Sequence, residues 1–107
     1  MKLLLDECVD ERLRLLFSAH DCQTARFAKV AGLKNGALLE AAESAGFDVP
    51  ITADQNIPDQ QNLSGRELAI LVFCAPTNRL RDLTPLVPAA ISALASIQHG
   101  QVMKIRQ

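Results

Sequence analysis

The sequence of 107 residues contains no Trp and no Tyr, and its only aromatic residues are four Phe. Single-stranded nucleic acids are usually held by stacking their bases on aromatic side chains, so a stacking platform is not expected. The formal net charge of -1 also lacks the positive excess that a sequence-independent duplex binder needs. The composition alone therefore disfavours recognition through stacked bases or through overall charge.

Cysteine is scarce, and long apolar runs are absent. The three cysteines, Cys8, Cys22 and Cys74, are an odd number without metal-ligand spacing, which favours reduced thiols and a cytoplasmic location. We expect Cys8 and Cys74 to be inert thiols packed in the core. Residues 1–10 do not resemble a signal peptide, and the uncharged stretch 83–103 is interrupted by prolines and a glycine. No membrane association is therefore predicted.

Charge is distributed unevenly along the chain. Residues 1–59 hold ten acids and six bases, whereas residues 60–107 hold two acids and five bases. The near-zero net charge therefore conceals an acidic first half and a basic second half.

Hydrophobic patterns predict alternating strands and helices in one domain that covers residues 1–107. Short apolar runs predict strands over 2–5, 20–25, 47–52, 68–74 and 101–106. Helical spacing predicts helices that begin after Asp10, begin at Asn35 and end near Gly46, and extend from Leu83 to Ala95. This order predicts an α/β fold with a mainly parallel sheet of about five strands, right-handed crossovers and three α/β/α layers.

Acidic residues follow two of the predicted strands. Asp6 and Glu7 come directly after the first strand, and Asp54 comes after the third. Parallel strands place their carboxyl ends at one edge of the sheet, so these carboxylates can converge there. Such a cluster needs a cation, and its hard oxygen ligands suit Mg²⁺ or Mn²⁺. The alternative interpretation is that these acids are turn residues or helix caps.

Two other polar segments offer weaker signals. The run from Asn56 to Asn62 is more typical of a hydrogen-bonded loop than of a binding site. Arg79 and Arg81 flank a predicted strand-to-helix loop and could hold a phosphate, although surface solvation is the more common role of such arginines.

Four segments in order along nearly the whole chain resemble one known family. They are MKLLLDECVDERL, GLKNGALLEAAESAGFDV, ITADQNIPDQQNLSGR and TNRLRDLTPLVPAAISAL. Together they resemble the small prokaryotic PIN-like domain family, which is related to the VapC-type toxin nucleases. The resemblance implies a three-layer PIN-like fold and a carboxylate pocket that holds divalent ions for RNA cleavage.

Two acids of the family pattern match this chain residue by residue. Asp6 matches the acid after the first strand, and Asp54 matches the acid of the T-x-D motif, so both are expected to be catalytic. Where relatives often carry further acids, this chain has Asn35, Ala37 and Asn56.

The expected metal-ligand set takes these departures into account. It comprises Asp6, Glu7, Asp54, the amide of Asn56, and Glu40. Glu40 and Asp59 are the side chains that could compensate for the missing acids. The residues expected to contact phosphate or RNA are Asn35, Gln61, Asn62, Arg66 and Arg79.

The resemblance implies that the chain is a Mg²⁺- or Mn²⁺-dependent endoribonuclease with an incomplete acidic site. Such an enzyme could be the toxin of a toxin-antitoxin pair. RNA and an antitoxin-like protein would then be its partners, and the last helix would allow a homodimer. One alternative is a catalytically impaired PIN-like module that binds nucleic acid or protein. A second is a receiver-like phosphoacceptor domain, with Asp54 as phosphoacceptor and Thr77 and Lys104 as switch residues, although Lys104 lies within the last predicted strand.

Overall fold

A computed structural model gives the arrangement of the chain and describes residues 1–33, 35–55, 63 and 65–106, apart from the side chain of Asn35. Five parallel strands form one sheet in the order β2-β1-β3-β4-β5. The strands are β1 (Lys2–Leu5), β2 (Asp21–Thr24), β3 (Val49–Thr52), β4 (Ile70–Phe73) and β5 (Val102–Ile105). All five predicted strands are confirmed, and the sheet is entirely parallel.

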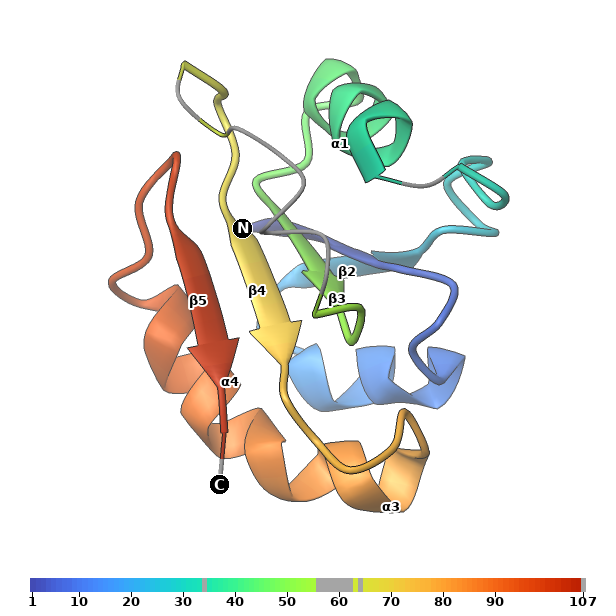
Figure 1. Cartoon of the computed structure of the whole chain (residues 1–107), viewed down its shortest axis with the longest axis vertical. Helices are drawn as coiled ribbons and strands as arrows, with labels where there is room; N and C mark the ends of the chain where they lie inside the picture. Colours follow the sequence, from blue (N-terminus) through green and yellow to red (C-terminus); the bar gives the residue numbers. More distant parts are fainter. Residues whose placement is uncertain (34, 56–62, 64, 107) are drawn as a thin grey trace.

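Helices cover both faces of the sheet, which confirms the three-layer α/β fold (Figure 1). One face packs against η1 (Glu11–Phe17), α3 (Leu80–Leu83), η2 (Thr84–Leu86) and α4 (Val87–Leu94). The other face packs against α1 (Asn35–Ser44) and against Leu63 and Leu68. Along β4, Leu71 and Phe73 face the first layer while Ile70 and Val72 face the second. A strand buried on both faces must be apolar throughout, as β4 is.

The helix predicted after Asp10 forms, but as the 3-10 helix η1. Asp10 is its N-cap, and its Oδ1 accepts a hydrogen bond from the Arg12 N–H at 2.9 Å. The Arg12 guanidinium also donates to both carboxylate oxygens of Asp10, at 3.0 and 2.8 Å. These bonds to Arg12 lower the pKa of Asp10 from its ordinary 3.8 to about 2.

The helix predicted from Leu83 to Ala95 starts earlier, at Leu80, and ends at Leu94. It is divided into α3, η2 and α4. Pro85 lies in the first turn of η2 and Pro88 in the first turn of α4. Because proline lacks an N–H, it fits the first turn of a helix and interrupts the α-helical bonding of the turn before it. The helix α1 ends near Gly46 as expected, and Gly46 takes a left-handed conformation with φ of 82°.

The last crossover departs from the expected right-handed pattern. The connection from β1 to β2 moves toward one edge of the sheet and carries η1, while the connection from β4 to β5 moves toward the opposite edge and carries α3 and α4. Both connections cover the same face, so they have opposite hands. The connection from β2 to β3 covers the other face with α1 and shares the hand of the first. Among these three connections, the β4–β5 connection is therefore the one that departs from the rule of uniform handedness.

Figure 1 shows α4 behind β5, and η1 near α3 at the lower end of the molecule. This final crossover places α3 in contact with η1. Within the described ranges, no helix has both the length and the apolar character needed to cross a membrane.

Truncation of a buried leucine in η1 should destabilise the protein. Leu13 is 0% exposed and Leu15 is 62% exposed, so the two offer the same chemical change in different surroundings. We expect Leu13→Ala to lower the free energy of unfolding by about 2–5 kcal/mol. Leu15→Ala should change it by less than about 0.5 kcal/mol. Urea unfolding followed by circular dichroism measures both values, and similar losses would contradict the packing of η1.

The carboxyl of Asp10 should titrate unusually low. Because its folded pKa is depressed, the stabilisation by its pair with Arg12 is complete at neutral pH and is lost as the pH falls through about 2. Carbon-detected NMR of the Asp10 carboxyl should show the low midpoint in the native protein. Arg12→Gln should move that midpoint toward 3.8, and an unchanged midpoint would show that Arg12 is not its cause.

Candidate functional site

The strand order reverses direction at β1. The chain runs from β1 to β2 on one side and then crosses to β3 on the other side. In open parallel sheets, a crevice forms at the carboxyl ends of the strands at such a switch point, and ligands bind there. Asp6 directly follows β1, and Asp54 lies two residues beyond the end of β3. The two acids predicted to be catalytic are therefore placed at the position that parallel topology favours for a ligand.

A single hydroxyl connects these two segments. Thr52, which is 1% exposed, donates a hydrogen bond from Oγ1 to Asp6 Oδ2 at 2.8 Å. The same Oγ1 accepts a hydrogen bond from the backbone N–H of Asp54 at 3.0 Å. The backbone N–H of Glu7 donates to Asp6 Oδ1 at 2.8 Å. Each oxygen of the Asp6 carboxylate thus accepts a bond that fixes its orientation, and a carboxylate oxygen can accept further bonds or bind a cation.

Cys8 belongs to this cluster, although we expected an inert core thiol. It is half-buried against the core, and its Sγ lies 3.4 Å from Asp6 Oδ2 and 3.5 Å from Thr52 Oγ1. Burial raises the pKa of the Cys8 thiol, and the negative charge of Asp6 adds to the increase, while the hydrogen bond with Thr52 opposes it. The thiol therefore stays protonated at neutral pH and acts as a weak donor toward the carboxylate.

The loop after β4 closes the cluster from another side. Asn78 donates from Nδ2 to the backbone carbonyl of Cys8 at 2.9 Å. This bond joins the segment that follows β4 to the segment that follows β1, and so fixes the loop that carries Asp6 and Cys8.

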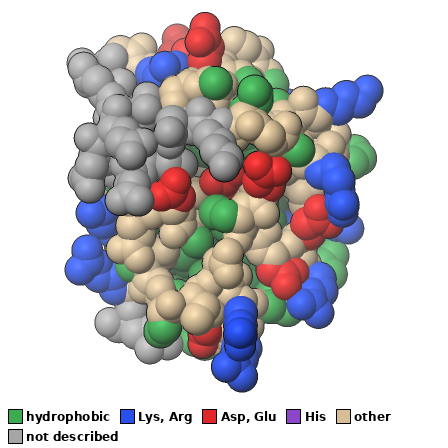
Figure 2. Space-filling model, turned by 45° about the vertical axis from the view of Figure 1, so that its right-hand side comes forward, with side chains coloured by type: hydrophobic (Ala, Val, Ile, Leu, Met, Phe, Trp, Pro, Cys, Tyr) green, Lys and Arg blue, Asp and Glu red, His purple; other side chains and the backbone are tan. Residues whose placement is uncertain are grey.

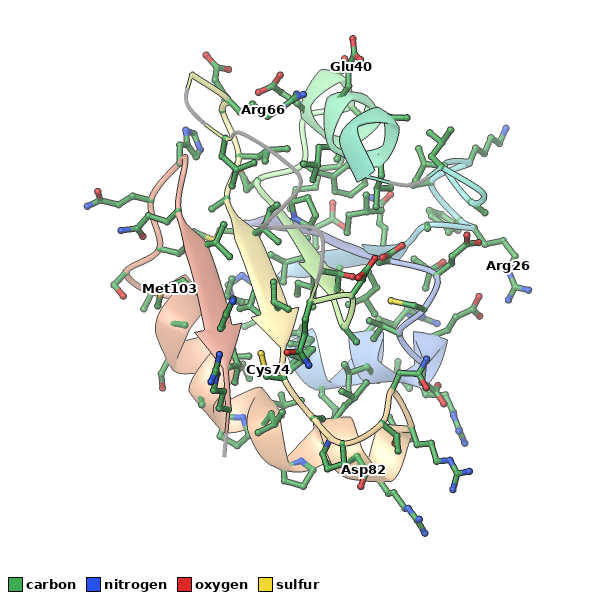
Figure 3. All side chains as sticks on the ribbon, in the orientation of Figure 1. Arg26, Glu40, Arg66, Cys74, Asp82 and Met103 are labelled. Atoms are coloured by element: carbon green, nitrogen blue, oxygen red, sulfur yellow. The ribbon has the colours of Figure 1, made fainter. Side chains whose placement is uncertain are left out.

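Two other predicted metal ligands lie apart from this centre. Glu7 directs its carboxylate to the turn before α1, where Oε1 accepts a hydrogen bond from the Gly32 N–H at 3.2 Å. Glu40 is exposed on α1 and points away from the sheet (Figure 3). The structure therefore does not bring Glu40 to Asp6. Over the described part of the chain, no group of three or more His, Cys, Asp or Glu side chains is arranged to hold a metal ion.

The predicted RNA contacts are also separated. Arg66 forms an ion pair with Glu43 of α1 at 3.5 Å. It lies beside α1, at the amino-terminal ends of the strands, whereas Asp82 of α3 lies at the opposite end of the molecule (Figure 3). Arg79 is exposed at the start of α3, on the same edge of the sheet as Asp6. Asn56, Asp59, Gln61 and Asn62, together with the side chain of Asn35, are outside what the structure describes.

Sequence reasoning missed the roles of Thr52, Cys8 and Asn78. The T-x-D pattern contains Thr52, but its bond to Asp6 depends on the pairing of β1 with β3, in which Leu5 lies opposite Ile51. No sequence signal marks Asn78, because the contact of a loop asparagine with a distant backbone carbonyl can be recognised only once the fold is known. Figure 2 shows several acidic side chains near the middle of one face, with further acids and Lys or Arg side chains toward its rim.

The chain matches none of the protein-family models, curated proteins or solved structures with which we compared it.

The contacts of Cys8 predict opposite effects of two substitutions on thiol reactivity. Asp6→Asn removes a negative charge that raises the pKa of Cys8, so alkylation should become faster at a given pH. Thr52→Val removes a hydrogen bond that lowers this pKa, so alkylation should become slower. The pH dependence of iodoacetamide labelling, followed for the Cys8 peptide by mass spectrometry, measures both. A midpoint that is the same in all three proteins would contradict the cluster.

Proposed function

We propose that this chain is a PIN-like, divalent-metal-dependent ribonuclease whose centre is formed by Asp6 and Asp54. The observation that carries the proposal is the Thr52 hydroxyl, which is bonded both to the Asp6 carboxylate and to the backbone of Asp54 at the switch point of the sheet. The sequence resemblance supports the same two acids. A toxin role would add an antitoxin-like partner protein.

The donor set fits Mg²⁺ or Mn²⁺ better than a cation that needs a full cage of protein ligands. Mg²⁺ is commonly held by one or two carboxylates together with waters and substrate phosphates. Asp6 and Asp54 could supply that number, and the remaining ligands would come from water and RNA. The described residues offer no larger ligand group, which argues against a closed structural metal site.

A divalent ion bound there would lower the pKa of a coordinated water and neutralise charge on the phosphate being cleaved. The chain's own residues would orient its ligands. Thr52 and the Glu7 N–H fix the two oxygens of the Asp6 carboxylate, so this carboxylate is held in one orientation before any ligand arrives. The N–H of Asp54, bonded to Thr52, fixes the turn that follows β3.

The catalytically impaired PIN-like module remains the second candidate. It is favoured by the exposed position of Glu40, which leaves the family's third acidic position without a replacement among the described residues. Such a protein would bind RNA through the same edge of the sheet without cutting it. Binding without metal-dependent cleavage would identify it.

A receiver-like domain shares the strand order 2-1-3-4-5. With right-handed crossovers, however, its β4–β5 connection would cover the face that carries α1. Here α3 and α4 cover the opposite face, beside η1, which argues against the receiver alternative.

The function is tested by incubating labelled single-stranded RNA with the purified chain. We expect cleavage with Mg²⁺ or Mn²⁺ and none with EDTA. Asp6→Asn and Asp54→Asn should each lower the rate at least about 100-fold, because even residues that only orient metal ligands contribute about 10–100-fold.

Glu67→Gln is the matched control, because Glu67 is an exposed acid that precedes β4 at the amino-terminal edge. It should retain the native rate. Cleavage by Asp6→Asn at the native rate would overturn the assignment.

A further inference from the structure

An open concavity beside the candidate site is lined by arginines from two segments far apart in the sequence. It is an open groove of about 710 Å³ between η1 and the segment that includes α3 and η2. Its lining residues are Asp10, Arg12, Arg79, Leu80, Arg81, Thr84 and Pro85. The sequence suggested a phosphate role for Arg79 and Arg81, but it gave no reason to group them with Arg12.

The charges in this groove are predominantly positive and available. Arg12 is paired with Asp10, yet its side chain stays 71% exposed. Within the described ranges, neither Arg79 nor Arg81 takes part in an ion pair. The one acid that lines the groove is already bonded to Arg12, so an incoming anion would meet two unpaired guanidinium groups and a third that is held in place.

The floor of the groove is fixed by the fold. Thr84 donates from Oγ1 to the backbone carbonyl of Leu80 at 2.7 Å, and Leu80 packs against the core. The Arg79 N–H donates to Thr77 Oγ1 at 3.1 Å, and the Thr77 hydroxyl is bonded in turn to Asp82. The loop that presents Arg79 is therefore held by its own hydrogen bonds.

The groove opens on the same edge of the sheet as the candidate centre. Arg79 follows Asn78, whose side chain is bonded to the Cys8 carbonyl, and the Cys8 thiol contacts the Asp6 carboxylate. Asp10 and Arg12 lie directly after the same β1 loop. A chain molecule lying along the groove would thus extend toward Asp6.

We propose that this groove, formed by Arg12, Arg79 and Arg81, binds the phosphate backbone of single-stranded RNA next to the Asp6 centre. The planar guanidinium fork matches phosphate oxygens in two-bond geometry. Because no Trp or Tyr is present to stack bases, the contacts are to phosphates and carry little sequence preference. The choice of RNA rests on the proposed function, whereas the anionic character of the ligand rests on the groove itself.

Phosphate binding in this groove predicts a specific dependence of RNA affinity on salt concentration. Each phosphate contact to a single strand contributes about 0.7 to the slope of log affinity against log salt concentration. Removing Arg79 and Arg81 together should reduce the slope by about 1.4 and weaken binding roughly 25-fold at about 0.1 M salt.

The experiment measures binding of a fluorescent oligouridine by anisotropy in EDTA, between about 50 and 200 mM salt, for native protein and for Arg79→Gln/Arg81→Gln. The matched control is Arg14→Gln/Arg26→Gln, which removes the same charge from a groove at the β2 edge. The control should keep the native slope and an affinity within about twofold of native, as surface charge away from the binding site contributes little. Circular dichroism of each variant verifies its fold.

Equal losses in the two double variants, or no loss in either, would overturn the inference. An acidic peptide of matched charge that binds as tightly as the RNA, with the same dependence on Arg79 and Arg81, would overturn RNA as the ligand. Because EDTA prevents metal-dependent cleavage, this binding assay does not depend on nuclease activity. If Asp6→Asn loses cleavage while Arg79→Gln/Arg81→Gln binds RNA as the native protein does, only the groove proposal is rejected. If the native protein binds RNA through the groove but does not cleave it, only the nuclease proposal is rejected.

Discussion

The parallel pairing of every neighbouring strand is the constraint on which the rest of the structure depends. Parallel strands cannot be joined by tight turns, so each connection must cross a face of the sheet and be covered by apolar contacts. All strands then end at one edge, and residues that follow β1 and β3 become neighbours although they are far apart in the chain. Thr52 turns this proximity into a bond between Asp6 and the Asp54 segment.

The placement of α3 and α4 on the face of η1 adds the second component. Had the last crossover followed the hand of the earlier ones, these helices would lie beside α1, and Arg79 would not share a groove with Arg12. The net charge of the chain is near zero because an acidic region and a basic region cancel each other. Asp6 and Asp54 of the first half follow β1 and β3 at the switch point, and Arg79 and Arg81 of the second half line the groove beside them together with Arg12.

The sequence predicted the elements that have a strong hydrophobic signal, such as β4, whose residues are all apolar. It could not predict the 3-10 form of η1, since the spacing of its apolar residues suits both helix types. Nor could it show that Arg66 pairs with Glu43, because this ion pair is a long-range contact. The outward position of Glu40, by contrast, follows from the helical spacing of Leu38, Leu39 and Ala42, which form the buried face of α1. The handedness of the last crossover leaves no local mark in the sequence at all.

The position of β1 inside the sheet, between β2 and β3, has a consequence for how the chain folds. This strand has no partner close to it in the sequence, because its two neighbours, β2 and β3, follow only after long connections. Each pairing must therefore close a long loop, and the loss of chain entropy comes before the stabilising contacts between the strands form. A protein of this topology should reach its native state more slowly than a helical bundle of equal length, with its apolar β1 dependent on the arrival of later segments for protection from water.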